Sequence, residues 1–158
     1  MSESSRVLAE ITRFVKGRTL LVGRKIGQEK FNMLGASLRV EAKPHKYPTG
    51  KNVVAWEKQL LSRFAEGDFN SIILHRFLYK PVKEYVEDPN ELLTEVKRIL
   101  PEGGVVVVNS FLLDERTKNF RSAESFYAEE DMKRVLQKQF KNILNVKAGD
   151  ALIFVCEK

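Results

Sequence analysis

The sequence contains a single cysteine, Cys156, among its 158 residues. One cysteine excludes an intrachain disulfide and a cysteine-ligated metal cluster, and it agrees with the cytoplasmic location that we expect. No apolar run approaches the roughly 18 residues that a membrane-spanning helix requires. Because the polar residues 1–5 lead directly into an amphipathic pattern, we also expect no secretory leader.

Several catalytic signatures are missing as well. The sequence has neither a Gly-x-Ser-x-Gly elbow nor a Walker loop, so nothing in it supports a hydrolase or a nucleoside triphosphatase. It has only two histidines, His45 and His75, and no cluster of carboxylates lies near either of them. We therefore expect no metal site.

Positive charge, by contrast, is concentrated in one part of the sequence. The net charge is +6, and residues 1–51 contain 11 basic and 4 acidic residues, whereas the remainder contains 16 and 17. Such asymmetry is typical of a protein with an anionic partner, such as a nucleic acid. It is equally typical of a solvated, lysine-rich surface, so both interpretations stay open.

Short apolar runs alternate with segments of helical periodicity along the whole chain. Strands that alternate with helices predict a mostly parallel sheet with helices on both faces, a three-layer α/β/α sandwich. The last two strands are joined by a short turn and predict an antiparallel hairpin. We expect one domain over residues 1–158, with helices at 4–16, 28–34, 53–64, 89–100 and 129–139, and strands at 19–22, 37–41, 71–74, 105–108, 140–146 and 151–156.

Three segments in this order resemble motifs of one enzyme family. Residues 91–108, ELLTEVKRILPEGGVVVV, are similar to a helix that turns through two glycines into a strand, "LL.E..R.LKPGG.l.i". Residues 68–79 are similar to "FD.I.....L.H", and residues 125–132 to the helix start "yt.eel". The chain therefore resembles the class I S-adenosylmethionine-dependent methyltransferases, which implies a Rossmann-like fold and S-adenosylmethionine as cofactor.

The cofactor motif of that family is matched less closely. Residues 21–27, LVGRKIG, stand where the family has the glycine-rich turn "D.G.G.G", so Gly23 and Gly27 match and Lys25 replaces the middle glycine. Residues 39–44, RVEAKP, resemble the second-strand motif "G.D.S.P". The resemblance implies that Gly23 and Gly27 hold the cofactor and that Glu41 binds its ribose hydroxyls.

Each of these site residues has an alternative interpretation. Arg24 and Lys25 attract an anionic group of the ligand, or they fill the cleft in which the cofactor would lie. Glu41 is the ribose ligand or an ordinary carboxylate at a strand end. His75 directly follows a strand, at the edge where α/β sheets bind ligands, so it is either the catalytic base or a histidine that caps the strand.

Two functions remain compatible with the sequence. In the first, the protein is a methyltransferase with an unknown acceptor. In the second, it is a non-catalytic relative, a binding or regulatory subunit that contacts nucleic acid through its basic first third, in which the loop 43–51 combines lysines with Tyr47. The family's third-strand acid has no clear counterpart, since Trp56, Glu57 and Gln59 lie in a segment of helical spacing. We therefore expect that this strand has been lost.

Overall fold

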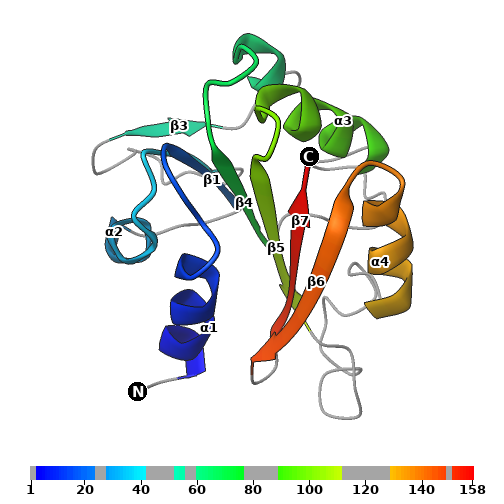
Figure 1. Cartoon of the computed structure of the whole chain (residues 1–158). Coiled ribbons are helices and arrows are strands. Elements are labelled where there is room, and N and C mark those ends of the chain that lie inside the picture. Colours follow the sequence, from blue (N-terminus) through cyan, green and yellow to red (C-terminus); the bar gives the residue numbers. More distant parts are fainter. Residues whose placement is uncertain are drawn as a thin grey trace.

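A computed structural model describes residues 3–23, 28–41, 52–55, 60–76, 89–111, 129–148 and 151–158 (Figure 1). In this part of the chain, seven strands form one sheet between two layers of helices. The strands are β1 (Thr19–Gly23), β2 (Leu38–Glu41), β3 (Val53–Ala55), β4 (Ser71–His75), β5 (Val105–Phe111), β6 (Lys141–Ala148) and β7 (Ala151–Glu157). The helices are α1 (Glu3–Thr12), α2 (Gln28–Leu34), α3 (Pro89–Ile99), α4 (Glu129–Gln137) and the 3-10 helix η1 (Leu60–Arg63).

The sheet has the strand order β3-β2-β1-β4-β5-β7-β6. The first five strands in this order pair in parallel, and β7 is antiparallel to both of its neighbours, β5 and β6. The predicted three-layer sandwich, with a mostly parallel sheet and a terminal antiparallel hairpin, is confirmed. The strand order reverses at β1, because β2 and β3 extend the sheet in one direction and β4 and β5 extend it in the other.

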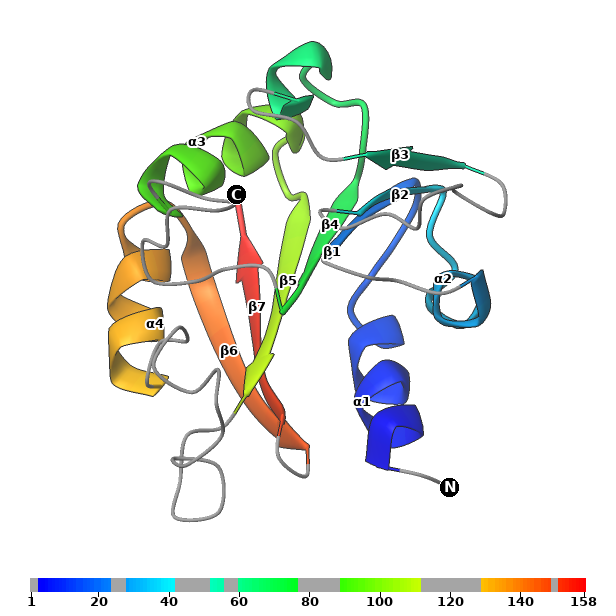
Figure 2. The same ribbon diagram turned by 180° about the vertical axis from the view of Figure 1, so that it is seen from behind.

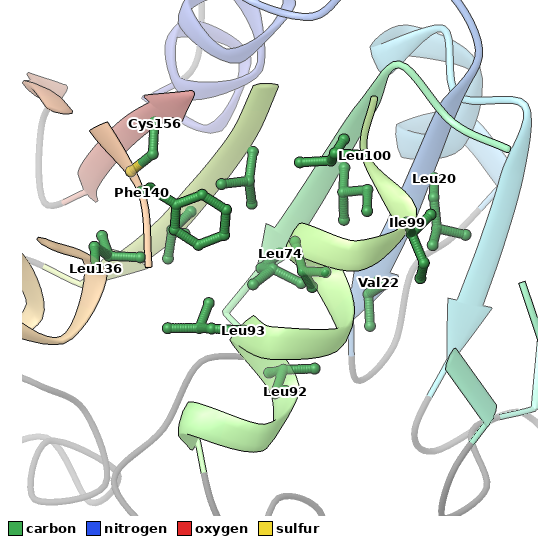
Figure 3. Packing of buried hydrophobic residues seen from close by; sticks show 14 of the residues in the cluster. Leu20, Val22, Leu74, Leu92, Leu93, Ile99, Leu100, Leu136, Phe140 and Cys156 are labelled. Carbon is green, nitrogen blue, oxygen red and sulfur yellow. The ribbon is translucent and has the colours of Figure 1, made fainter. Parts of the chain in front are cut away.

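Each face of the sheet is covered by its own helices. Helices α1 and α2 lie together beside the sheet, as Figure 2 shows from behind. They bury Val7, Ile11 and Phe31 against one of its faces. The other face is covered by η1, α3 and α4, whose apolar side chains meet those of the strands. Figure 3 shows this packing for α3 and α4. None of the helices in the described residues is long and apolar enough to cross a membrane.

Burial on both faces explains the composition of the central strands. All five residues of β1 and all five of β4 are buried, which is why these strands are continuous apolar runs rather than alternating ones. Helix α3 instead buries a single stripe that includes Leu92, Leu93 and Val96. Its first residue is Pro89, whose fixed φ suits that position and whose missing amide proton costs no helical hydrogen bond.

The first helix is shorter than predicted. We expected it to reach residue 16, but α1 ends at Thr12. The backbone of Lys16 instead pairs with the Ser71 hydroxyl, which accepts from its amide and donates to its carbonyl. The amide of Arg18 donates to Asn70 Oδ1. These hydrogen bonds tie the end of the connector to the start of β4, and they replace the last turn of the expected helix.

The prediction of a helix over residues 53–64 is wrong, and so is the expected loss of the third strand. Val53 and Val54 lie in β3, which pairs in parallel with β2, and only the short η1 follows. Two adjacent β-branched residues favour a strand at a sheet edge, although their spacing to Leu60 and Leu61 coincides with that of a helix. The candidates Trp56, Glu57 and Gln59 lie outside the described residues.

Candidate functional site

The carboxyl ends of β2, β1 and β4 lie next to one another at one end of the sheet, and β5 passes beside them and continues for two more residues. Parallel pairing places Gly23 of β1 opposite Glu41 of β2 on one side and opposite His75 of β4 on the other. His75 in turn pairs with Asn109 of β5. We refer to these four residues as the strand-end row. Ligands of open α/β sheets bind outside this edge, where the strand order reverses, and Gly23 lies at that point.

The side chain of His75, the last residue of β4, lies between the sheet and α2, and the residue is only 6% exposed. It alternates with Ile73 along β4, so both side chains point to the face that α1 and α2 cover. Its Nε2 is 3.1 Å from Nζ of Lys30, the third residue of α2, and its Nδ1 is 2.8 Å from the side-chain nitrogen of Asn109. Both ring nitrogens are therefore engaged with the protein.

The proton positions in this cluster follow from the partners. A lysine ammonium can only donate, so Nε2 of His75 accepts and Nδ1 carries the proton of the neutral ring. Nδ1 then needs an acceptor, and Oδ1 of Asn109 is buried without a hydrogen-bond partner. Oxygen and nitrogen of an amide are assigned from such networks. Turning the Asn109 amide by half a rotation brings Oδ1 to the Nδ1 proton, so that this oxygen accepts a hydrogen bond from the ring.

Burial, and to a smaller extent the positive charges of Lys30 and Arg76, together lower the pKa of His75 from 6.5 to about 3. The imidazole is consequently neutral at physiological pH. A ring that is buried, with both nitrogens engaged, is better suited to hold a neighbour in place than to remove a proton from a substrate. The role of His75 as catalytic base stays a prediction from the sequence.

Lys30 is a partly buried cation without a compensating charge in its described surroundings. The pKa of its ammonium is lowered, first by burial and then by the positive charge of Arg76. Its one hydrogen-bond partner in the described part of the chain is the neutral His75. A buried charge is normally paired with an opposite one. The strand-end row therefore carries positive potential on the side of α2.

The remaining predicted site residues are only partly placed by the structure. The backbones of Gly23 and Glu41 lie side by side at the carboxyl ends of β1 and β2, as the resemblance implies. The side chain of Glu41 lies outside the described part of the chain, and so do Arg24, Lys25 and Gly27. The basic loop 43–51, with His45 and Tyr47, also lies outside the described residues.

Sequence reasoning missed Lys30 and Asn109. Asn109 directly follows a run of four valines, and a polar residue directly after an apolar run is the same signal that identified His75, so the sequence could have revealed it. Lys30 carries no comparable signal, because it is one of 11 basic residues in the first 51. It lies 45 residues before His75 in the chain and reaches it only through the sheet topology.

A separate hollow is lined by residues of α1 and α2. It has a volume of about 410 Å³ and an apolar lining that includes Leu8, Ala9 and the exposed Met33. It shares no residue with the strand-end row and has no titratable side chain in its lining. It therefore offers nothing to acid–base or ionic chemistry.

The whole described architecture matches that of solved methyltransferases. The chain is similar to a SAM-dependent methyltransferase from Archaeoglobus fulgidus, with a TM-score of 0.76 and 14% identity over 99% of this chain and 95% of that one. It is also similar to one from Thermotoga maritima, with a TM-score of 0.69 and 17% identity over 99% and 91%. The TM-scores, over nearly the whole chain, establish a shared fold.

A third similar structure comes from a complex with the Trm112 methyltransferase activator of Haloferax volcanii. Its TM-score is 0.72, with 12% identity over 98% of this chain and 89% of that one. No family model matches the sequence, and no curated protein matches it either. The resemblance stated from the sequence motifs is therefore supported by three-dimensional structure alone.

Proposed function

We propose that this chain, which has the fold of the SAM-dependent methyltransferases, binds S-adenosylmethionine at its strand-end row and transfers the methyl group to an acceptor. The observation that carries the proposal is the register that sets Gly23 beside Glu41 at the switch point of the sheet. When bound, this cofactor supplies an electrophilic methyl group on a sulfonium. The chain's part is to orient it, since methyl transfer depends on in-line proximity.

Each residue has a specific part in this proposal. Gly23 lets the ligand approach the backbone at the end of β1 because it has no side chain, and the sequence match assigns the same part to Gly27. The Glu41 carboxylate accepts two hydrogen bonds from the ribose diol. Arg24 and Lys25, between the two glycines, supply positive charge toward an anionic group of the ligand.

Calorimetric titration with S-adenosylmethionine and S-adenosylhomocysteine tests the proposal. A hydrogen bond to a charged group contributes about 1.5–3 kcal/mol, so Glu41→Gln should raise the Kd about tenfold or more. Glu29→Gln is the matched control, because Glu29 is an exposed carboxylate on α2. A folded wild-type sample that binds neither compound below millimolar concentration would contradict the proposal.

A second candidate function is that of a non-catalytic binding or regulatory subunit with this fold. The burial of His75 favours it, because the residue that the sequence offers as a base is held between Lys30 and Asn109. If the titration described above showed that a folded sample binds neither compound, this second candidate would be favoured. Contact with nucleic acid through residues 1–51 would show as an affinity that falls steeply with salt, and a slope near zero would exclude it.

A further inference from the structure

The contacts of Lys30 differ from those of a lysine that serves only the fold. Its ammonium group lies 3.1 Å from a neutral imidazole nitrogen, and it has no carboxylate partner among the described side chains. A carboxylate in the place of His75 would orient the ammonium and also neutralise it. The imidazole orients it and leaves its charge in place.

His75 is itself fixed in the tautomer that this contact needs. Asn109 is 1% exposed and meets Nδ1 of the ring at 2.8 Å, so it holds the ring with Nε2 toward Lys30. The Lys30 ammonium has three N–H donors, and His75 accepts a hydrogen bond from one of them. The other two have no acceptor among the described residues, and they are available to an anionic group at the sheet edge.

The position of Lys30 relative to Glu41 limits which anionic group this can be. Lys30 contacts His75 at the end of β4, whereas Glu41 lies at the end of β2. Because β1 lies between these two strands, their ends are about 10 Å apart at the usual spacing of neighbouring strands. S-adenosylmethionine carries a diol on its ribose and a carboxylate at the far end of its amino-acid arm. That arm is long enough to bridge the distance between the two strand ends.

We propose that Lys30 binds the amino-acid carboxylate of the cofactor, and that His75 and Asn109 are positioning residues that direct the Lys30 ammonium toward it. This inference rests on the proposed function, since it needs the cofactor to lie along the strand-end row. The ionic contact fixes one end of the ligand and the ribose contact fixes the other. The reacting sulfonium lies between them.

The test compares two ligands that differ in the amino-acid arm. S-adenosylhomocysteine carries the carboxylate, and 5′-methylthioadenosine has the same adenosyl thioether without the arm. Lys30→Gln should raise the Kd of the first ligand about tenfold to a hundredfold, the range for a hydrogen bond to a charged group, and leave the Kd of the second unchanged. Lys133→Gln, which removes an exposed lysine of α4, should change neither.

The positioning role of His75 has its own expected result. His75→Leu removes the acceptor of the ammonium, so it should weaken binding of S-adenosylhomocysteine and leave 5′-methylthioadenosine unaffected. A residue that only supports the fold would weaken both ligands alike. The second ligand therefore also reports whether each variant is folded, and Lys30→Met repeats the test with a side chain that suits partial burial.

Three results would overturn the inference. Equal losses for both ligands would make Lys30 a structural residue. Unchanged binding of both ligands would show that Lys30 does not touch the cofactor, while the proposed function would stand. If the wild type bound neither ligand, the proposed function and this inference would fail together.

Discussion

The buried imidazole predicts an acid sensitivity that can be assigned to one residue. Folding holds the pKa of His75 at about 3, against 6.5 for the exposed side chain. As the pH falls below 6.5, the unfolded chain takes up a proton on this ring and the folded chain does not. The stability that depends on the neutral ring is fully present above pH 6.5, and it decreases steadily as the pH falls toward 3.

The size of the loss follows from the two pKa values. Each pH unit between them costs about 1.4 kcal/mol of unfolding free energy, so acidification from about pH 7 to about pH 4.5 removes about 2.5 kcal/mol through His75 alone. Other groups also titrate over this range, and they do so in every variant. The difference between wild type and a His75→Gln variant therefore isolates the contribution of this ring.

Urea unfolding followed by circular dichroism at the two pH values measures this difference. The wild type should lose about 2.5 kcal/mol more than His75→Gln on acidification, whatever the stability of the variant at neutral pH. Equal losses in the two proteins would refute the burial of a neutral ring. A direct check is the NMR titration of the folded protein in a His45→Gln background, which leaves His75 as the only histidine. A ring signal that titrates near pH 6.5 would refute it as well.

Two further substitutions test the contacts described above. Asn109→Asp should raise the pKa of His75 from about 3, because a carboxylate beside the ring stabilises the imidazolium, and an unchanged NMR titration would contradict the contact. Gly17→Ala and Gly35→Ala both put a side chain at a φ near +65°, which costs about 1–2 kcal/mol. Gly17→Ala should be the more damaging in thermal melts, because its Cβ would clash with the side chain of Asn70, whereas nothing lies within 4 Å at Gly35. Equal melting temperatures for the two variants would mean that Asn70 does not pack against Gly17.

The strands could be predicted well because burial on both faces leaves a strong local signal. The run Val105–Val108 is apolar throughout, and it forms the first part of β5. The helix at 28–34 was predicted with the bounds that α2 has. The wrong prediction of a helix over 53–64 has a physical reason too. Strand β3 is held by its backbone pairing with β2, and such pairing leaves no trace in the spacing of side chains.

The candidate site was predictable only where a residue matches a family motif or directly follows a strand. Glu41 was identified by its motif and His75 by its position, and the structure places both at the carboxyl ends of the two parallel strands that neighbour β1. That His75 is buried beneath α2 did not follow from its position after four apolar residues, because burial depends on which helix covers the strand end. Its contact with Lys30 depends on the pairing of β1 with β4, which the sequence order does not specify.

The amino-acid sequence determined the elements and their layers, because apolar periodicity is a local property that each segment carries in its own residues. Only the tertiary structure decided which side chains meet at the strand ends and what charge they keep there. Lys30, His75 and Asn109 come from α2, β4 and β5, and the environment of each is set by the other two. The pKa values of such a cluster, and hence its capacity to hold an anion, arise from burial and neighbouring charge, and both exist only in the folded chain.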